Sequence, residues 1–195
     1  MVSIKKILDT LICLVALFAL APVFSYLDRP VQLAALLTLP LALWCDRRGR
    51  YLLSSRLGTL LAVVGVILYA TQVTREDVAT PVVHALVLLL LVRLLSSRQG
   101  RDYLQVFLLA LFILAGSSLI HLEIGFIVYL VLLVFSVTLG LVMLTVFETD
   151  KTLAMSPREL WKLIRIGLLL PAVSLLLMLV FFVMLPRTRH PLWNF

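Results

Sequence analysis

Short polar segments divide this sequence into seven long runs of apolar residues. A helix of about 20 apolar residues spans the hydrocarbon of a bilayer. The chain is 63% hydrophobic and 14% charged, which is more apolar than soluble domains, at about 45–50%. We therefore expect an all-α, polytopic transmembrane bundle of about seven spans, forming a single membrane domain over residues 1–195. The runs are 7–24, 31–45, 57–73, 78–92, 103–120, 124–147 and 166–185.

Two of the runs, 31–45 and 78–92, are short for a span. A flanking residue such as Arg93 can extend a run by reaching outward to the interface, and a bilayer can thin locally. The run 31–45 can also be re-entrant. Both readings of this segment remain open from the sequence.

The positive charges alternate along the chain between rich and poor loops. Thirteen of the 17 Lys and Arg residues lie before the first run or in the loops after the second, fourth and sixth runs. Cytoplasmic loops carry such an excess of Lys and Arg. We therefore predict that the N-terminus lies inside and the C-terminus outside. The net charge of +7 does not indicate nucleic-acid binding, because the basic residues are separated by apolar runs.

The N-terminal segment also resembles a secretory signal, with Lys5 and Lys6 before an apolar stretch and an Ala19-Leu20-Ala21 site. Cleavage there would require the amide bond to Pro22, whose ring disfavours the geometry that a peptidase needs. We therefore interpret the segment as an uncleaved first span.

The longest polar stretch, 148–165, contains Ser156-Pro157-Arg158-Glu159, which is a capping box with proline at the first helical position. The following apolar residues predict an amphipathic helix. We expect residues 156–165 to form a connector at the inner interface that turns into the last span.

No apolar run has a carboxylate or an ammonium group at its centre, which argues against ion-coupled transport. His84, within the fourth run, is the deepest ionisable group. A lone histidine in a membrane more often hydrogen-bonds a neighbouring helix than relays protons or binds a ligand. Cys13 and Cys45 lie in or beside apolar runs without a metal or redox spacing. The sequence thus predicts no metal and no cofactor.

Ser117 and His121 share a helix face near the predicted outer surface, beside Ser118. A serine with a histidine base is an acyl-transfer pair. No third orienting group and no Gly-x-Ser-x-Gly elbow accompany them. The sequence favours the alternative, in which Gly116 and the two serines let helices approach closely. Ser136 and Gly140 indicate the same kind of packing.

Asp102 stands where the fifth helix is expected to begin. It is suited to be the N-cap, and Gln105 can complete a capping box. Arg101 then marks the inner side of the membrane.

Two stretches of the chain have a familiar pattern. The first, HALVLLLLVRLLSSRQGRDYLQVFLLALFILAGSSLI, places Arg93-Leu94-Leu95 before a short turn, Arg101-Asp102 and a long apolar helix. The second, FFVMLPRTRHPLWNF, follows the last run with Pro186-Arg187 and then Pro191-Leu192-Trp193. Their order and spacing resemble the N-terminal membrane domain of the TgpA-type bacterial transglutaminase-like proteins, also described as protein-glutamine gamma-glutamyltransferases.

This resemblance implies a helical membrane bundle whose last span leads outside into a papain-like transglutaminase domain with a Cys/His/Asp triad. A further C-terminal span often follows that domain. The present sequence stops before such a domain, and Cys13 and Cys45 cannot be assigned as its nucleophile. We therefore expect no catalytic activity from this chain. It would be a truncated or split version, or would work alone or with a separately encoded partner.

The leading hypothesis is an anchor and interaction domain in the bacterial cytoplasmic membrane. It would position an extracytoplasmic transglutaminase-like module or partner, and its inner basic clusters would meet anionic lipids. Arg101 and Asp102 would shape the inner surface, and the segment from Pro186 and Arg187 to Trp193 would aim the outer module.

The alternative is a small transporter or lipid-handling protein. Its cavity would lie among helices kinked at Pro40, Pro81 and Pro171. It would need a polar site, for which the candidates are His84, Ser117, Ser118 and His121.

Overall fold

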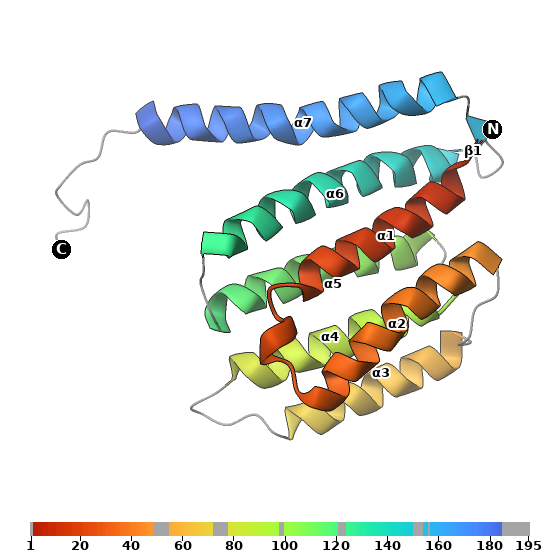
Figure 1. Ribbon diagram of the computed structural model, residues 1–195, viewed down its shortest axis with the longest axis vertical. Coiled ribbons are helices and arrows are strands. Elements are labelled where there is room, and N and C mark those ends of the chain that lie inside the picture. The colour runs from red at the N-terminus through yellow and green to blue at the C-terminus, as the bar shows by residue number, and fades with distance from the viewer. Residues whose placement is uncertain are drawn as a thin grey trace.

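The computed structural model describes residues 2–48, 55–71, 78–97, 100–120, 124–149, 154–155 and 157–184. These residues form seven α-helices, one 3-10 turn and two very short strands, with helices that run back and forth between two ends of a bundle (Figure 1). The elements are β1 Val2–Ser3, α1 Ile4–Leu20, η1 Phe24–Tyr26, α2 Arg29–Arg48, α3 Ser55–Ala70, α4 Ala79–Leu95, α5 Gly100–Ile120, α6 Ile124–Thr149, β2 Ala154–Met155 and α7 Pro157–Met184.

Helix α1 lies at the centre of the bundle, where it packs against α2, α5 and α6. Its buried residues include Ile4, Leu8, Ile12 and Ala16, spaced four apart so that they share one face. The small side chain of Ala16 lets a neighbouring helix approach closely. The helix ends at Leu20, because the residue before Pro22 is driven out of helical geometry.

The other helices are arranged around α1 and against one another. Helices α1 and α2 cover α5 and α4, α3 packs on the far side of α4, and α7 lies beside α6 (Figure 1). The two-residue strands β1 and β2 are antiparallel, with Val2 opposite Met155. This pairing fixes the start of α1 beside the start of α7.

Three helices are long and apolar enough to cross a membrane: Gly100–Ile120, Gly125–Thr149 and Arg158–Met184. Helices α3 and α4 contain shorter apolar segments, Leu57–Ala70 and Ala79–Leu95. The all-helical architecture is thus confirmed, and the three long helices indicate a membrane protein. The count of about seven spans and their orientation stay predictions.

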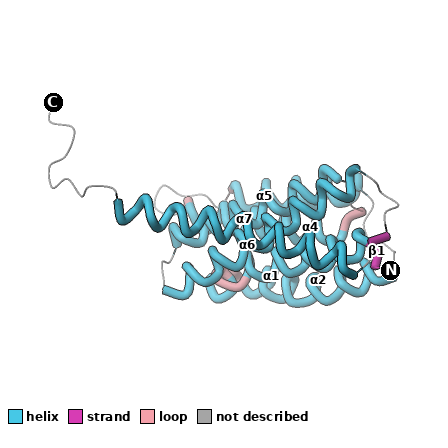
Figure 2. Tube along the Cα trace, turned by 90° about the horizontal axis from the view of Figure 1, so that it is seen from above, coloured by secondary structure: helices cyan, strands magenta, loops and turns pink. Residues whose placement is uncertain are grey.

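Helix α7 is the most peripheral element of the described bundle. Of the 18-residue apolar stretch of α7, 11% is buried inside the bundle, against 44% for the corresponding stretch of α5 and 33% for that of α6. The far end of α7 extends past the neighbouring helices in both views (Figures 1 and 2). The helix is continuous from Pro157 to Met184, so residues 157–165 form one helix with the last apolar run, and their place at the inner interface stays a prediction. Ser156 itself lies outside the described residues.

Pro81 also differs from expectation. It is the third residue of α4, where a backbone N–H would have no helical acceptor, so it removes no hydrogen bond from the helix. Pro40 and Pro171 do lie inside α2 and α7, as predicted.

We call the end of the bundle where α1, α3, α5 and α7 begin the basic end, and the opposite one the Asp28 end. Among the described residues, the basic end carries Lys5, Lys6, Arg48, Arg93, Arg101, Arg158 and Lys162, which all lie near helix termini on that side. Arg29, at the start of α2, lies at the Asp28 end. The alternation of charge along the sequence thus becomes an asymmetry between the two ends.

Candidate functional site

His84 lies one turn into α4 and is buried, with 3% of its surface exposed. Its Nδ1 lies 2.7 Å from the Thr80 carbonyl oxygen, which can only accept, so Nδ1 carries the proton and donates. Its Nε2 accepts a 3.0 Å hydrogen bond from the backbone N–H of Asp28. The two partners therefore assign the neutral ring with hydrogen on Nδ1.

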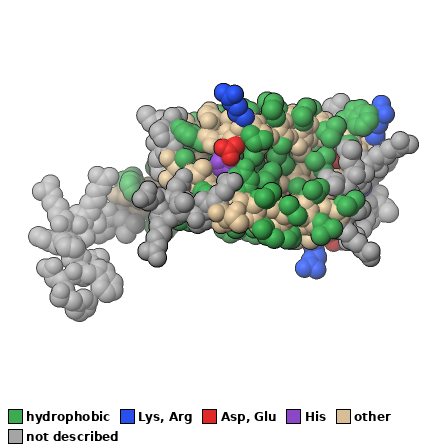
Figure 3. All heavy atoms as spheres, turned by 90° about the horizontal axis from the view of Figure 1, so that it is seen from below, with side chains coloured by type: hydrophobic (Ala, Val, Ile, Leu, Met, Phe, Trp, Pro, Cys, Tyr) green, Lys and Arg blue, Asp and Glu red, His purple; other side chains and the backbone are tan. Residues whose placement is uncertain are grey.

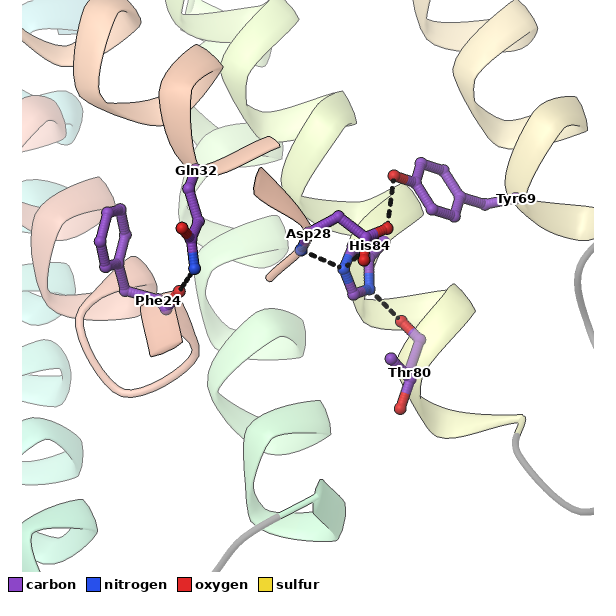
Figure 4. Close-up of polar contacts among 6 residues, drawn as sticks. All are labelled: Phe24, Asp28, Gln32, Tyr69, Thr80 and His84. Carbon is purple, nitrogen blue, oxygen red and sulfur yellow. Dashed lines mark hydrogen bonds and ion pairs between the residues drawn. The ribbon is translucent and has the colours of Figure 1, made fainter. Parts of the chain in front are cut away.

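Asp28 and Tyr69 complete this cluster from two other parts of the chain (Figure 4). The Tyr69 hydroxyl donates a 3.3 Å hydrogen bond to Asp28 Oδ2, and the tyrosine ring stacks on the imidazole with centroids 5.2 Å apart. The same Oδ2 lies 3.6 Å from His84 Nε2. We call Asp28, Tyr69, Thr80 and His84 the Asp28 cluster.

The chain reversal between α1 and α2 positions Asp28. After α1 ends, the turn η1 leads to α2, and Gln32 Nε2 donates a 2.9 Å hydrogen bond to the carbonyl of Phe24 (Figure 4). The Gln32 backbone N–H also bonds the Asp28 carbonyl, at 2.9 Å, which starts α2. Asp28 is thereby fixed directly before the helix, with its carboxylate toward α3 and α4.

An apolar groove adjoins the Asp28 cluster on the α3–α4 face. Its volume is about 260 Å³, and Tyr69, Val66 and Ala70 of α3 face Val82 and Leu89 of α4 across it. Tyr69 therefore belongs both to the groove and to the cluster. Figure 3 shows an acidic side chain beside a histidine on a surface of mainly hydrophobic side chains.

A second polar group lies inside the basic end. Asp9 of α1 is 5% exposed, and Tyr103 of α5 donates a 2.7 Å hydrogen bond to its Oδ1. Nearby, the Cys13 thiol lies 4.0 Å from Asp46 Oδ2. A cavity of about 400 Å³ is lined by Lys6, Asp9 and Asp46, among others. The sequence search overlooked Asp9, because this residue lies near the start of the first run, 7–24, rather than at its centre.

Asp102, one of the residues expected to shape the inner surface, forms an ion pair at the α4–α5 junction. Arg93 Nη1 donates a 3.2 Å hydrogen bond to Asp102 Oδ1, and the two side chains are 26% and 22% exposed. Helix α5 begins at Gly100, so the prediction that Asp102 is its N-cap is wrong, and Asp102 lies in the first turn. Arg101 is exposed at this end.

The two serine candidates, Ser117 and Ser118, both lie on α5. Ser117 is buried in α5, and Ser118 donates a 2.7 Å hydrogen bond to the carbonyl of Ala115 on the same helix. Gly116 packs against Val83 of α4, where an added Cβ would lie 2.6 Å from Val83 Cγ2. Close helix approach at this position is thus confirmed.

Several predicted residues fall outside the described part of the chain. They are His121, Pro186, Arg187 and Trp193. The acyl-transfer pair of Ser117 with His121 therefore stays a prediction. Within the described residues no hydrogen bond joins His84 to Ser117 or Ser118, since Thr80 and Asp28 engage both ring nitrogens.

The Asp28 cluster presents a hydrogen-bonding carboxylate to its surroundings. The cluster holds no serine or cysteine nucleophile beside its histidine, and among the described residues no group of three or more His, Cys, Asp or Glu could hold a metal ion. The Asp28 side chain is 58% exposed and can accept hydrogen bonds from outside.

Asp28 and Tyr69 were not predicted from the sequence as members of this cluster. The alternation of the runs, which places Asp28 and His84 at the same end, was the pattern that could have paired them.

A family model described as the TgpA N-terminal domain matches residues 11–195. The chain belongs to the TgpA N-terminal domain family. The TgpA N-terminal domain is the N-terminal part of a transglutaminase-like protein, and the 195 residues contain no catalytic domain. No curated protein and no solved structure matches the chain. The predicted resemblance is thus confirmed.

Proposed function

We propose that this TgpA N-terminal domain is an anchor and interaction domain of the bacterial cytoplasmic membrane, which positions an extracytoplasmic transglutaminase-like module or a partner that carries one. The family match over residues 11–195 carries the proposal, because this domain is the N-terminal part of a transglutaminase-like protein. The three long apolar helices supply the membrane attachment.

The asymmetry of charge between the two ends supports the orientation. Lys5 and Lys6 begin α1 and Arg158 begins α7 at the same end, and basic residues stay preferentially in the cytoplasm. With the basic end inside, the far end of α7 points outward. The module or partner would then be held on the outer side.

Helix α7 is suited to carry this connection. It packs on α6 at Gly167, where an added Cβ would lie 2.9 Å from Leu139 Cδ1, and at the buried Pro171. Every residue of the helix beyond Pro171, up to Met184, is exposed within the described structure. The far part of α7 thus offers a lateral surface to another polypeptide.

Reporter fusions test the orientation. Alkaline phosphatase is active only outside the cytoplasm, so we expect activity when it follows Phe195 and none when it follows Ser97, at the basic end. A fluorescent protein that folds only in the cytoplasm should give the opposite result at both positions. Phosphatase activity after Ser97, or its absence after Phe195, would refute the orientation.

Site-specific photo-crosslinking tests the positioning role. Benzoylphenylalanine at Met184, 74% exposed, should crosslink to a tagged transglutaminase-like domain of a TgpA-type protein expressed in the same cells. The matched control is Leu119, which is 77% exposed at the same end of the bundle but belongs to α5. Equal crosslinking from both positions, or none from Met184, would reject the role of α7 while leaving the family assignment intact.

A further inference from the structure

The Asp28 cluster leaves a carboxylate oxygen available to the surroundings. Both recorded side-chain contacts of Asp28, with Tyr69 and His84, involve Oδ2. Among the described residues no hydrogen bond or ion pair is made to Oδ1, and the side chain is 58% exposed. Because His84 Nε2 accepts from the Asp28 backbone N–H, the imidazole donates nothing to the carboxylate, which can accept a hydrogen bond from a cation outside the cluster.

Arg29, the next residue, supplies the opposite charge. It is exposed at the first position of α2, and the described structure records no carboxylate paired with it. A guanidinium binds phosphate oxygens in a fixed geometry. An anionic and a cationic side chain therefore stand next to each other at the Asp28 end of the bundle.

Tyr69 lines the apolar groove and donates to Asp28, so it joins the groove to the carboxylate that precedes Arg29 in the chain. The groove is nearly free of polar surface along Val66, Ala70, Val82 and Leu89. Its volume of about 260 Å³ lies below the about 300–1,000 Å³ of small-molecule sites. A narrow apolar groove with a charged rim suits one acyl chain of a lipid whose headgroup stays at the rim.

We propose that the α3–α4 groove and the Asp28–Arg29 rim bind one phospholipid with a primary-ammonium headgroup, phosphatidylethanolamine. Arg29 contacts the phosphate, the ammonium group donates to Asp28 Oδ1, and Tyr69 lines the beginning of the acyl chain. This assignment rests on the charges and the groove, and it does not depend on the anchor role.

The chemistry of the rim selects this headgroup. An ammonium group has three N–H donors for a charge-assisted hydrogen bond to the carboxylate, whereas the trimethylammonium of phosphatidylcholine has none. Phosphatidylglycerol has a phosphate but no cation, and Asp28 repels it. The preference for phosphatidylethanolamine should therefore depend on Asp28, while Arg29 should serve all three lipids.

Native mass spectrometry of the full chain in detergent tests the site. The protein is titrated with phosphatidylethanolamine, phosphatidylcholine and phosphatidylglycerol that carry the same acyl chains. We expect the first lipid to be retained about tenfold more than the other two, as one hydrogen bond to a charged group implies. Equal retention of the three lipids would overturn the proposal.

Three variants and a control make the test specific. Asp28→Asn should lower phosphatidylethanolamine to the level of phosphatidylcholine, and Arg29→Gln should weaken all three lipids. Val82→Trp, at a position 45% exposed, should fill the groove and reduce retention of every headgroup. Glu159→Gln, an exposed carboxylate at the start of α7, should change nothing. If Asp28→Asn does not fold, undiminished lipid retention by Val82→Trp still refutes the site.

Discussion

Tyr103 and Asp9 are joined by a 2.7 Å hydrogen bond in the interior of the bundle, although they stand 94 positions apart in the chain. Tyr103 is 1% exposed and Asp9 is 5% exposed, so the bond fixes α5 against the central helix α1. A buried carboxylate is costly unless it is hydrogen-bonded. This contact is therefore part of what sets the position of α1.

The first prediction is that Tyr103→Phe destabilises the domain. The substitution keeps the ring and its edge contact with Phe147 but removes the donor to Asp9. We expect a loss of about 1–3 kcal/mol in the free energy of unfolding, measured by reversible denaturation in mixed micelles. The control is Tyr129→Phe, a half-buried tyrosine of α6, which should change the value much less. Equal losses for the two variants would contradict the role of this bond.

The second prediction concerns the contact between α4 and α5. Gly116→Ala brings a Cβ to 2.6 Å from Val83 Cγ2, so the Val83 side chain or the helices must shift. We expect a destabilisation of about 1–3 kcal/mol in the same denaturation assay. Gly125→Ala is the matched control, since no atom lies within 4 Å of a Cβ there, and it should be neutral or slightly stabilising.

A suppressor variant distinguishes this clash from an effect on helix propensity. Val83→Ala removes the methyl group that the new Cβ meets, so the double variant should lose less stability than the sum of the two single variants. Strict additivity of Gly116→Ala and Val83→Ala would show that the two residues do not compete for space.

The sequence predicted the helices of the bundle more closely than the contacts between them. Apolar length alone placed seven helices, and the fifth run ends with α5 at Ile120 while the sixth begins with α6 at Ile124. The first run was extended too far, because its apolar residues continue beyond Leu20 while Pro22 stops the helix. Hydropathy records composition, and it does not detect where backbone geometry ends a helix.

The candidate site could be predicted only in part. His84 was predicted to hydrogen-bond a neighbouring helix, and its ring bonds the backbone of Asp28, directly before α2, and of Thr80 on its own helix. Asp28 and Tyr69 come from a loop and another helix, and one sequence does not record which helix ends are adjacent. Hydropathy also does not show whether a polar segment and the apolar run after it form one helix, as residues 157–184 do.

The third prediction addresses the ion pair between Arg93 and Asp102 at the basic end. Both side chains are mostly buried, at 26% and 22% exposure, so solvent screens the pair only in part. A double-mutant cycle with Arg93→Ala and Asp102→Ala should give a coupling of about 0.5–1 kcal/mol in the free energy of unfolding. Arg101→Ala, at an exposed neighbouring arginine, should show no coupling to Asp102→Ala. A larger coupling to Arg101 would mean that the recorded pair is not the one that stabilises the junction.

The fourth prediction tests the Asp28 cluster through His84. The substitution His84→Phe retains a flat ring against Tyr69 but removes the acceptor for the Asp28 backbone N–H and the donor to the Thr80 carbonyl. The start of α2 should then open more often, and the free energy of unfolding should fall by about 1–3 kcal/mol.

Hydrogen exchange at the Asp28 amide is the direct measurement of this effect, since that N–H is bonded to Nε2 in the native domain. Exchange should become markedly faster in His84→Phe. It should stay close to the native rate in Tyr69→Phe, which removes only a 3.3 Å hydrogen bond to a partly exposed carboxylate. If both variants accelerate exchange equally, the imidazole is not what holds the reversal between α1 and α2. If neither does, the amide is protected by the surrounding helices, and the bond to His84 contributes nothing to the stability of that end.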